Sequence, residues 1–174
     1  MNASRSGTFA EFHRRSLADP VGFWAEQARL VDWQRPFDAV CDTSRPPFGN
    51  WFVGGTTNRC HNAVDRHLAT RASQPALIHV STETGSERVY SFAELHAEVQ
   101  RMAAVLQSLG VVSGDRVLLY LPMIPEAAFA MLACARIGAL HSVVFGGFAG
   151  SSLPHRIAHA EAQVFITAQA RLRA

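Results

Sequence analysis

The chain has 174 residues, which suits one ordinary domain, and 48% of them are hydrophobic, enough for a packed core. Its 16 basic and 14 acidic residues nearly balance, so the composition indicates neither a nucleic acid nor a membrane as a partner. All of these basic residues are Arg, which excludes a lysine of this chain as a catalytic group in adenylation or Schiff-base chemistry.

Cysteine usage and apolar runs bear on the compartment. Cys41, Cys60 and Cys134 are odd in number and widely spaced, which is typical of free thiols in a reducing cytosol rather than of a disulfide framework. The first residues lack the apolar run of a signal peptide, and the longest apolar run, 127–135, is far shorter than the roughly 20 residues of a membrane span. These features predict a soluble, cytoplasmic protein.

The first region of the chain, residues 1–67, is rich in aromatic residues and interrupted by prolines. Asp19 followed by Pro20 is typical of a helix start, with Asp as the N-cap and Pro in the first turn. The helical spacing is then expected to turn four side chains inward, namely Phe23, Trp24, Ala28 and Val31.

Prolines are expected to break the chain after this helix. Pro36 and Pro46–Pro47 predict an irregular loop, because proline lacks the N–H group that helices and strands use. A second helix is expected after Asn58, where apolar residues at four-residue spacing form a stripe of Cys60, Val64 and Leu68.

The second region, residues 68–174, alternates short apolar runs with longer amphipathic stretches. The apolar runs predict strands at 76–80, 88–90, 117–121, 140–145 and 164–167. Helices are expected to begin at the capping box of Ser91 and Glu94, at Pro125 and near residue 152. Gly110 and Gly138 are expected to end the first two of these helices.

This alternation predicts an α/β fold. The first two strands are expected to pair as a hairpin through a turn at 83–86. The later strands predict the start of a mostly parallel sheet, with right-handed crossovers and covering helices, after the N-terminal helix and loop region.

A glycine-rich turn, Phe145-Gly146-Gly147-Phe148, leaves a strand and enters a helix. Glycines let backbone N–H groups approach a ligand, and a helix N-terminus favours negative charge, so a phosphate-bearing ligand suits this turn. A tight turn without any ligand explains the same residues. A dinucleotide fingerprint fits poorly, because the spacing is Gly-Gly-x-x-Gly rather than Gly-x-Gly-x-x-Gly.

Two groups of residues carry metal-ligand types without a metal-site pattern. His155 and His159 stand four apart on an expected helix, but Arg156 follows the first where a zinc protease motif has Glu. The spacing of the second group does not place its members on one helical face; they are Cys60, His61, Asp65 and His67. We therefore predict no metal site and no catalytic residue within this chain.

Several longer strings are, taken together, highly specific. They are Trp51-Phe52-x-Gly54-Gly55-x-x-Asn58, Asn62-x-x-Asp65-Arg66-His67, Leu121-Pro122-Met123-Ile124-Pro125-Glu126-Ala127, Ala135-Arg136-Ile137-Gly138-Ala139 and Val144-Phe145-Gly146-Gly147-Phe148. Through them the chain resembles, from about residue 9 to residue 168, the AMP-forming acetyl-CoA and propionyl-CoA synthetases of the acyl-adenylate-forming superfamily. The sequence of residues 57–62 resembles the propionyl-CoA synthetases more than the acetyl-CoA synthetases.

The resemblance implies that the intact protein is an acid–thiol ligase. Such a ligase uses ATP and Mg²⁺ to turn propionate or acetate into an acyl-adenylate, and then transfers the acyl group to coenzyme A. In the family the Phe-Gly-Gly turn lies beside coenzyme A, which carries over to Phe145, Gly146 and Gly147.

A family arginine near the nucleotide end of coenzyme A carries over to Arg173, six positions after Thr167. The chain departs from the family pattern here, because Gln169 and Arg171 stand where Asp and Gly are usual. The assignment of Arg173 depends on this count alone.

The family's adenylation motifs do not occur in this sequence: it has no Thr/Ser/Gly-rich phosphate loop, no aromatic-Thr-Glu segment and no lysine. The resemblance therefore implies an N-terminal part of a synthetase, inactive by itself, with the ATP and Mg²⁺ sites elsewhere. The boundary between its N-terminal region and its AMP-binding region is expected at His67. An alternative from another class is a non-catalytic module that binds coenzyme A or a partner protein.

Overall fold

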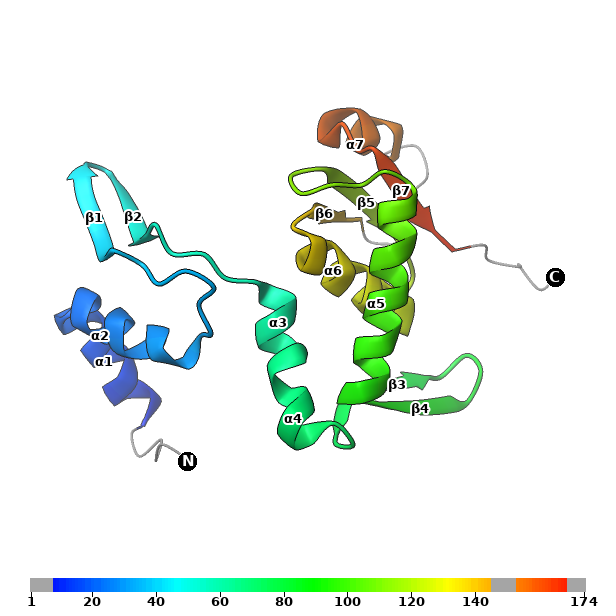
Figure 1. Ribbon diagram of the computed structural model, residues 1–174, viewed down its shortest axis with the longest axis horizontal. Coiled ribbons are helices and arrows are strands. Elements are labelled where there is room, and N and C mark those ends of the chain that lie inside the picture. Colours follow the sequence, from blue (N-terminus) through cyan, green and yellow to red (C-terminus); the bar gives the residue numbers. More distant parts are fainter. Residues whose placement is uncertain (1–7, 145–152, 169–174) are drawn as a thin grey trace. The chain divides into compact units, whose positions relative to one another are not determined.

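The computed structural model of the chain describes residues 8–144 and 153–168, and these form two compact units (Figure 1). The N-terminal unit comprises residues 1–57 and the α/β unit comprises residues 58–174. Within the described ranges, no helix has both the length and the apolar character needed to cross a membrane.

The N-terminal unit pairs two helices with a hairpin. Its elements are α1 (Phe9–Ala18), α2 (Pro20–Gln27), the 3₁₀ turn η1 (Ala28–Leu30), β1 (Ala39–Arg45) and β2 (Phe48–Val53). Helix α2 begins as the sequence predicts, because the Asp19 carboxylate accepts a hydrogen bond from the N–H of Gly22 at 2.9 Å and Pro20 occupies the first turn.

The inward face of α2 is narrower than predicted. Phe23 and Ala28 are buried, but 43% of Trp24 is exposed, so the prediction for Trp24 is wrong. Successive helical side chains point about 100° apart. Phe23 faces α1, where its ring meets that of Phe12 edge to face at 4.7 Å, and its neighbour in sequence cannot share that direction.

The predicted loop around Pro46–Pro47 is also wrong, because these prolines form the turn of a hairpin. Strands β1 and β2 pair antiparallel, with Ala39 opposite Val53 and Cys41 opposite Trp51. The peptide bond between the two prolines is cis. Proline interrupts a strand only where its missing N–H would be needed, and at a turn that N–H is not needed.

The α/β unit begins with three short helical segments rather than one helix. They are α3 (Arg59–Ala63), the 3₁₀ turn η2 (Asp65–His67) and α4 (Leu68–Arg71). The predicted stripe is confirmed at Cys60 and Val64, which are both buried, while Leu68 is half-buried. The helix breaks at Val64, whose backbone angles are not helical.

A hairpin and a long helix follow as predicted. Strands β3 (Pro75–Ser81) and β4 (Ser86–Ser91) pair antiparallel, and helix α5 (Phe92–Ser108) starts directly after them. The capping box is confirmed: the Ser91 hydroxyl accepts from the N–H of Glu94 at 3.2 Å, and the Glu94 carboxylate accepts from the N–H of Ser91 at 2.8 Å.

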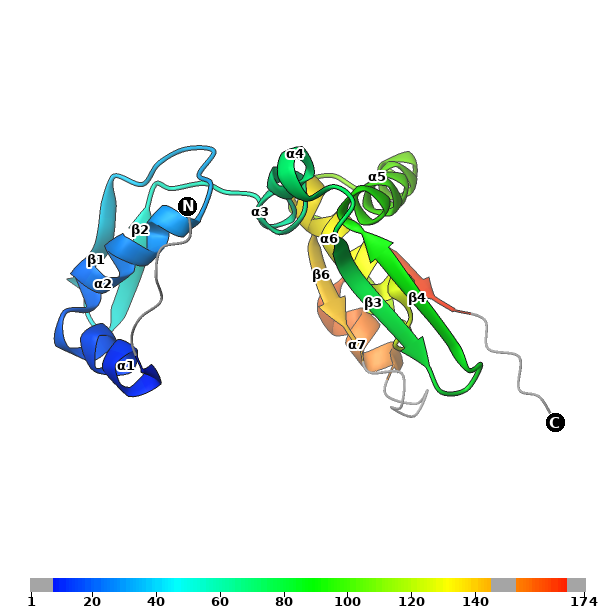
Figure 2. The same ribbon diagram turned by 90° about the horizontal axis from the view of Figure 1, so that it is seen from below.

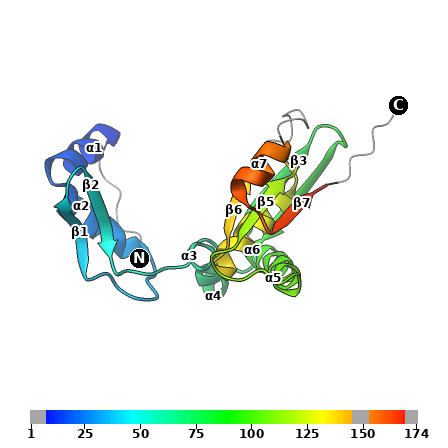
Figure 3. The ribbon, with the colours of Figure 1, turned by 90° about the horizontal axis from the view of Figure 1, so that it is seen from above.

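The sheet has three parallel strands in the order β6-β5-β7. The elements are β5 (Arg116–Tyr120), α6 (Pro125–Ile137), β6 (Leu140–Val143), α7 (Leu153–Ala160) and β7 (Val164–Thr167). Helices α6 and α7 lie on opposite sides of these strands (Figures 2 and 3). The predicted α/β class with a parallel sheet and covering helices is therefore confirmed.

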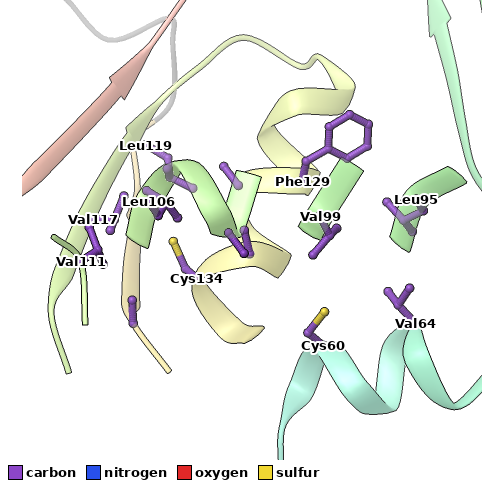
Figure 4. Close-up of a cluster of buried hydrophobic side chains, with 14 of the residues drawn as sticks. Cys60, Val64, Leu95, Val99, Leu106, Val111, Val117, Leu119, Phe129 and Cys134 are labelled. Atoms are coloured by element: carbon purple, nitrogen blue, oxygen red, sulfur yellow. The ribbon is translucent and has the colours of Figure 1, made fainter. Parts of the chain in front are cut away.

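The core of the α/β unit lies between the sheet and the helices α3, α5 and α6 (Figure 4). Strand β5 is at its centre, since its residues Val117, Leu118 and Leu119 are each only 1% exposed. The small residues Ala130 and Ala133 of α6 are completely buried, which lets α5 and α6 pack closely.

Candidate functional site

The carboxyl ends of the parallel strands meet at one edge of the sheet, and a hollow of about 230 Å³ lies there. In open α/β sheets, ligands bind outside the carboxyl ends of the strands, where the strand order changes direction. This sheet changes direction at β5, because β6 follows on one side of it and β7 on the other. The hollow therefore occupies the position of a ligand site in this fold class.

Four elements line the hollow, namely the hairpin strand β3, strand β5, the first half of α6 and the end of β6. Ile78, Leu119, Met131 and Val143 are lining residues from these elements, and the segment Leu121–Ile124 between β5 and α6 contributes as well. His79 is the one ionisable side chain among the described lining residues. Such a lining can hold an apolar group, but it supplies no pair of groups for acid–base catalysis.

The predicted coenzyme A contacts Phe145, Gly146, Gly147 and Arg173 lie outside the described residues. The structure does fix the approach to the glycine turn, because the N–H of Val144 donates to the carbonyl of Leu119 at 2.8 Å. Val144 is buried, and its neighbour Val143 lines the hollow. Strand β6 thus carries the chain to the carboxyl edge directly before the turn.

The string at residues 51–55 has a packing role. The rings of Trp33, Phe37 and Phe52 form one cluster, with centroids 5.2–5.4 Å apart. A Cβ atom on Gly55 would lie 2.8 Å from Cζ3 of Trp33, so only glycine fits there without a shift. Gly54 has a φ of +75°, in the left-handed region that favours glycine.

The strings at residues 58–67 and 135–139 meet in the α/β unit. The Asn58 amide donates to the carbonyls of Ala135 and Arg136, at 2.9 and 3.0 Å, while its oxygen accepts from the N–H of His61 at 3.1 Å. The Arg136 guanidinium donates to the carboxylate of Asp65. We call Asn58, Asp65 and Arg136 the clasp, because they hold α3 and η2 against the end of α6.

The clasp is partly shielded from water. About a quarter of each side chain of Asp65 and Arg136 is exposed, and Nε2 of His96 on α5 lies 3.7 Å from the Asp65 carboxylate. The Nε of Arg136 is buried without a hydrogen-bond partner among the described residues. Sequence reasoning missed the clasp, since its members stand 71 and 78 residues apart.

The buried thiols are not suited to nucleophilic chemistry. Burial raises the pKa of the Cys134 thiol to about 11. Burial also raises the pKa of the Cys60 thiol, against the opposing charge of Arg136. Among the described residues, no three side chains of His, Cys, Asp or Glu are placed to hold a metal ion.

Comparisons with known families identify the scaffold around this hollow. The family model described as AMP-binding enzyme matches residues 64–174, and the model described as the acetyl-coenzyme A synthetase N-terminus matches residues 9–63. The chain belongs to the AMP-binding enzyme family. These two matches meet at residues 63 and 64 and the two compact units meet at residues 57 and 58, while the boundary at His67 stays a prediction.

Individual relatives of this chain are acyl-CoA synthetases. A propionate–CoA ligase of Salmonella typhimurium is 56% identical over 166 residues, which are 95% of this chain and 26% of that protein. An acetyl-coenzyme A synthetase of Methylobacterium radiotolerans is 51% identical, with the same coverage. The resemblance inferred from the strings is therefore confirmed.

A solved structure agrees with this assignment. The acetoacetyl-CoA synthetase from Streptomyces lividans superimposes with a TM-score of 0.83 at 35% identity, over 92% of this chain and 25% of that one. The chain thus spans about a quarter of the length of the relatives that it matches.

Proposed function

We propose that this AMP-binding enzyme is the amino-terminal quarter of an acid–thiol ligase that activates propionate, or acetate, and joins it to coenzyme A. The observation that carries the proposal is the 56% identity with a propionate–CoA ligase over 95% of the chain. Propionate is placed before acetate because the acetyl-coenzyme A synthetase reaches 51%.

In this reaction the substrate carboxylate attacks the α-phosphorus of ATP, and pyrophosphate leaves. The thiol of coenzyme A then attacks the acyl carbon of the adenylate, and AMP leaves. Bound Mg²⁺ would offset the phosphate charge in the first step. We place the reaction in the cytoplasm, because the three cysteines are free thiols.

The 174-residue chain by itself is proposed to be inactive. The adenylating enzymes that it resembles use a lysine and a Thr/Ser/Gly-rich phosphate loop against the developing phosphate charge, and this sequence contains neither. Exchange of labelled pyrophosphate into ATP, driven by propionate, measures the first half-reaction. We expect no exchange above background, with the Salmonella ligase as the positive control; exchange by the purified chain would contradict the proposal.

Coenzyme A is proposed to contact the turn at Phe145, Gly146 and Gly147 and the side chain of Arg173. In a chimera, residues 1–174 replace the corresponding quarter of the Salmonella ligase. Replacing Arg173 by Ala there should raise the KM for coenzyme A about tenfold, since a charge-assisted phosphate contact contributes roughly 1.4 kcal/mol. The matched variant Arg171→Ala should leave that KM unchanged; equal effects of both changes would refute the contact.

The second candidate is a non-catalytic module that binds coenzyme A or a partner protein. It is favoured by the glycine-rich sequence 145–148, which follows β6 in the chain, because ligands of such sheets bind beyond the carboxyl ends of the strands. Calorimetric titration of the chain with coenzyme A separates the candidates. Micromolar binding by a chain without exchange activity would support the module, and the absence of binding heat would count against it.

A further inference from the structure

Helix α6 connects the hollow, which its first half lines as far as Met131, with the clasp at its carboxyl end. Helix α6 has 13 residues, which span about 20 Å at 1.5 Å per residue. Its first residues, with Pro125 at the start, line the hollow, while the carbonyls of Ala135 and Arg136 near its end accept the two hydrogen bonds of Asn58. A displacement of α6 at the clasp would therefore also move the residues of α6 that line the hollow.

Polar anchors of α6 are concentrated at its carboxyl end. There, Asn58 and Asp65 hold the backbone and the Arg136 side chain, and Gly138 ends the helix at a φ of +78°. The residue at the N-cap is Ile124, which makes no capping hydrogen bond. The end beside the hollow thus has a capping residue without a polar side chain.

The middle of α6 is buried in the core and packs on α5. Its buried side chains are Phe129, Ala130, Ala133 and Cys134, three of which are small. Close-packed protein interiors have low compressibility and transmit strain. A displacement imposed on the carboxyl end of α6 is therefore expected to reach the residues that line the hollow.

We propose that Asn58, Asp65 and Arg136 are positioning residues that set the place of α6, and thereby the shape of the hollow that the first half of this helix lines. The segment 58–65 is then part of the architecture of the site, although none of its residues is among those that line the hollow. The inference concerns the geometry of the hollow and holds for whichever acyl group the ligase takes.

The variant Asn58→Asp tests this inference with little change in size. Aspartate is as good an N-cap as asparagine, so the start of α3 keeps its hydrogen bond, but both donors to α6 are lost. The new charge also faces the negative end of the α6 dipole. Carbon-13 labelled methionine methyl groups report the outcome: Met131 lines the hollow from α6, whereas Met102 belongs to α5 and is not among the residues that line it.

We expect the Met131 methyl resonance to shift by more than its linewidth in Asn58→Asp, while the Met102 resonance stays in place. The matched control Asn50→Asp, on the exposed face of β2, should move neither. A second variant, Asp65→Asn, keeps the shape of the pair but removes its charge, and a smaller Met131 shift is expected.

An unchanged Met131 resonance in Asn58→Asp, with Met102 at its native position, would overturn the inference. If Asn58→Asp loses the native Met102 resonance, Asp65→Asn decides, and an unmoved Met131 there overturns it equally. Loss of both native resonances in both variants would also contradict it, because the clasp would then support the whole unit rather than position one helix.

Discussion

The two units of the molecule are stabilised by different means. Of the 20 buried hydrophobic residues among those described, only Phe23 and Ala28 belong to the N-terminal unit, and the other 18 belong to the α/β unit. The N-terminal unit exposes large apolar side chains, such as Phe9 at 84% and Phe48 at 79%, as the α/β unit also does at Met123. The conformation of the N-terminal unit depends on contacts between aromatic rings and on glycines, whereas that of the α/β unit depends on the burial of apolar side chains.

This difference predicts different local stabilities, since segments with few buried apolar contacts open more easily. The sequence provides a convenient separation of signals, because all three tryptophans, Trp24, Trp33 and Trp51, lie in the N-terminal unit. Tryptophan fluorescence therefore follows that unit alone, while most of the helical circular dichroism signal comes from the α/β unit, which contains α5 and α6.

The largest effect is expected in the core of the α/β unit. Leu106 on α5 is 1% exposed, and Leu106→Ala should destabilise the unit by about 2–5 kcal/mol, through lost burial and a residual cavity. The matched change Leu109→Ala, at a leucine that is 61% exposed, should cost less than about 0.5 kcal/mol. Urea unfolding followed by circular dichroism measures both; similar costs for the two would contradict this description of the core.

A smaller effect is expected from the glycine pair of the N-terminal unit. Gly55→Ala places a methyl group against Trp33 and Phe37 and should cost about 1–3 kcal/mol, as overpacking does. Gly49→Ala, in the same hairpin, meets only the Cys41 sulfur at 3.9 Å and serves as the control. Tryptophan fluorescence should show an earlier transition for Gly55→Ala alone, and coinciding curves for both variants would refute the packing role.

Loss of the capping box of α5 should destabilise the chain less than Leu106→Ala or Gly55→Ala. Ser91→Ala removes the hydroxyl that caps Glu94 and should cost about 1 kcal/mol. Ser108→Ala, near the other end of the same helix, is the control, because its hydroxyl donates to the carbonyl of Val105 and caps no N–H group. A cost for Ser91→Ala no greater than for this control would show that the box is not stabilising.

The smallest effect is a pH dependence from the same box. Hydrogen bonds from the Ser91 N–H and hydroxyl lower the pKa of the Glu94 carboxyl from its ordinary value of 4.5. This stabilisation is present above pH 4.5 and is lost as the pH falls through the lowered folded-state pKa. The unfolding temperature of the native chain should therefore fall as the pH is lowered, and it should fall less in Glu94→Gln. The same fall in the native chain and in the variant would contradict this prediction.

Local signals in the sequence predicted most of the α/β unit. The capping box at Ser91 and Glu94, Pro125 at a helix start and Gly138 at a helix end each act within one turn of helix, so the sequence carries them directly. The hairpin at 39–53 was missed, because β1 contains Asp42 and other polar residues and prolines stand at its turn.

Features that depend on distant contacts could not be predicted. The clasp joins residues 78 apart, and the hollow needs β3, α6 and β6 together. The resemblance strings carry Asn58, Asp65 and Arg136, but they give no indication that these side chains meet. Periodicity placed Trp24 and Phe23 on one inward face, whereas the contact of Phe23 with Phe12 decides which of them is buried.

The most direct test of the proposed function is propionate-dependent exchange of pyrophosphate into ATP by the chimera of residues 1–174 with the remainder of the Salmonella ligase. Because 56% of the aligned residues are identical, we expect exchange within about tenfold of the parent ligase, a difference below roughly 1.4 kcal/mol in the barrier. Propionate should be preferred to acetate. A folded chimera without exchange would contradict the assignment of this chain to such a ligase.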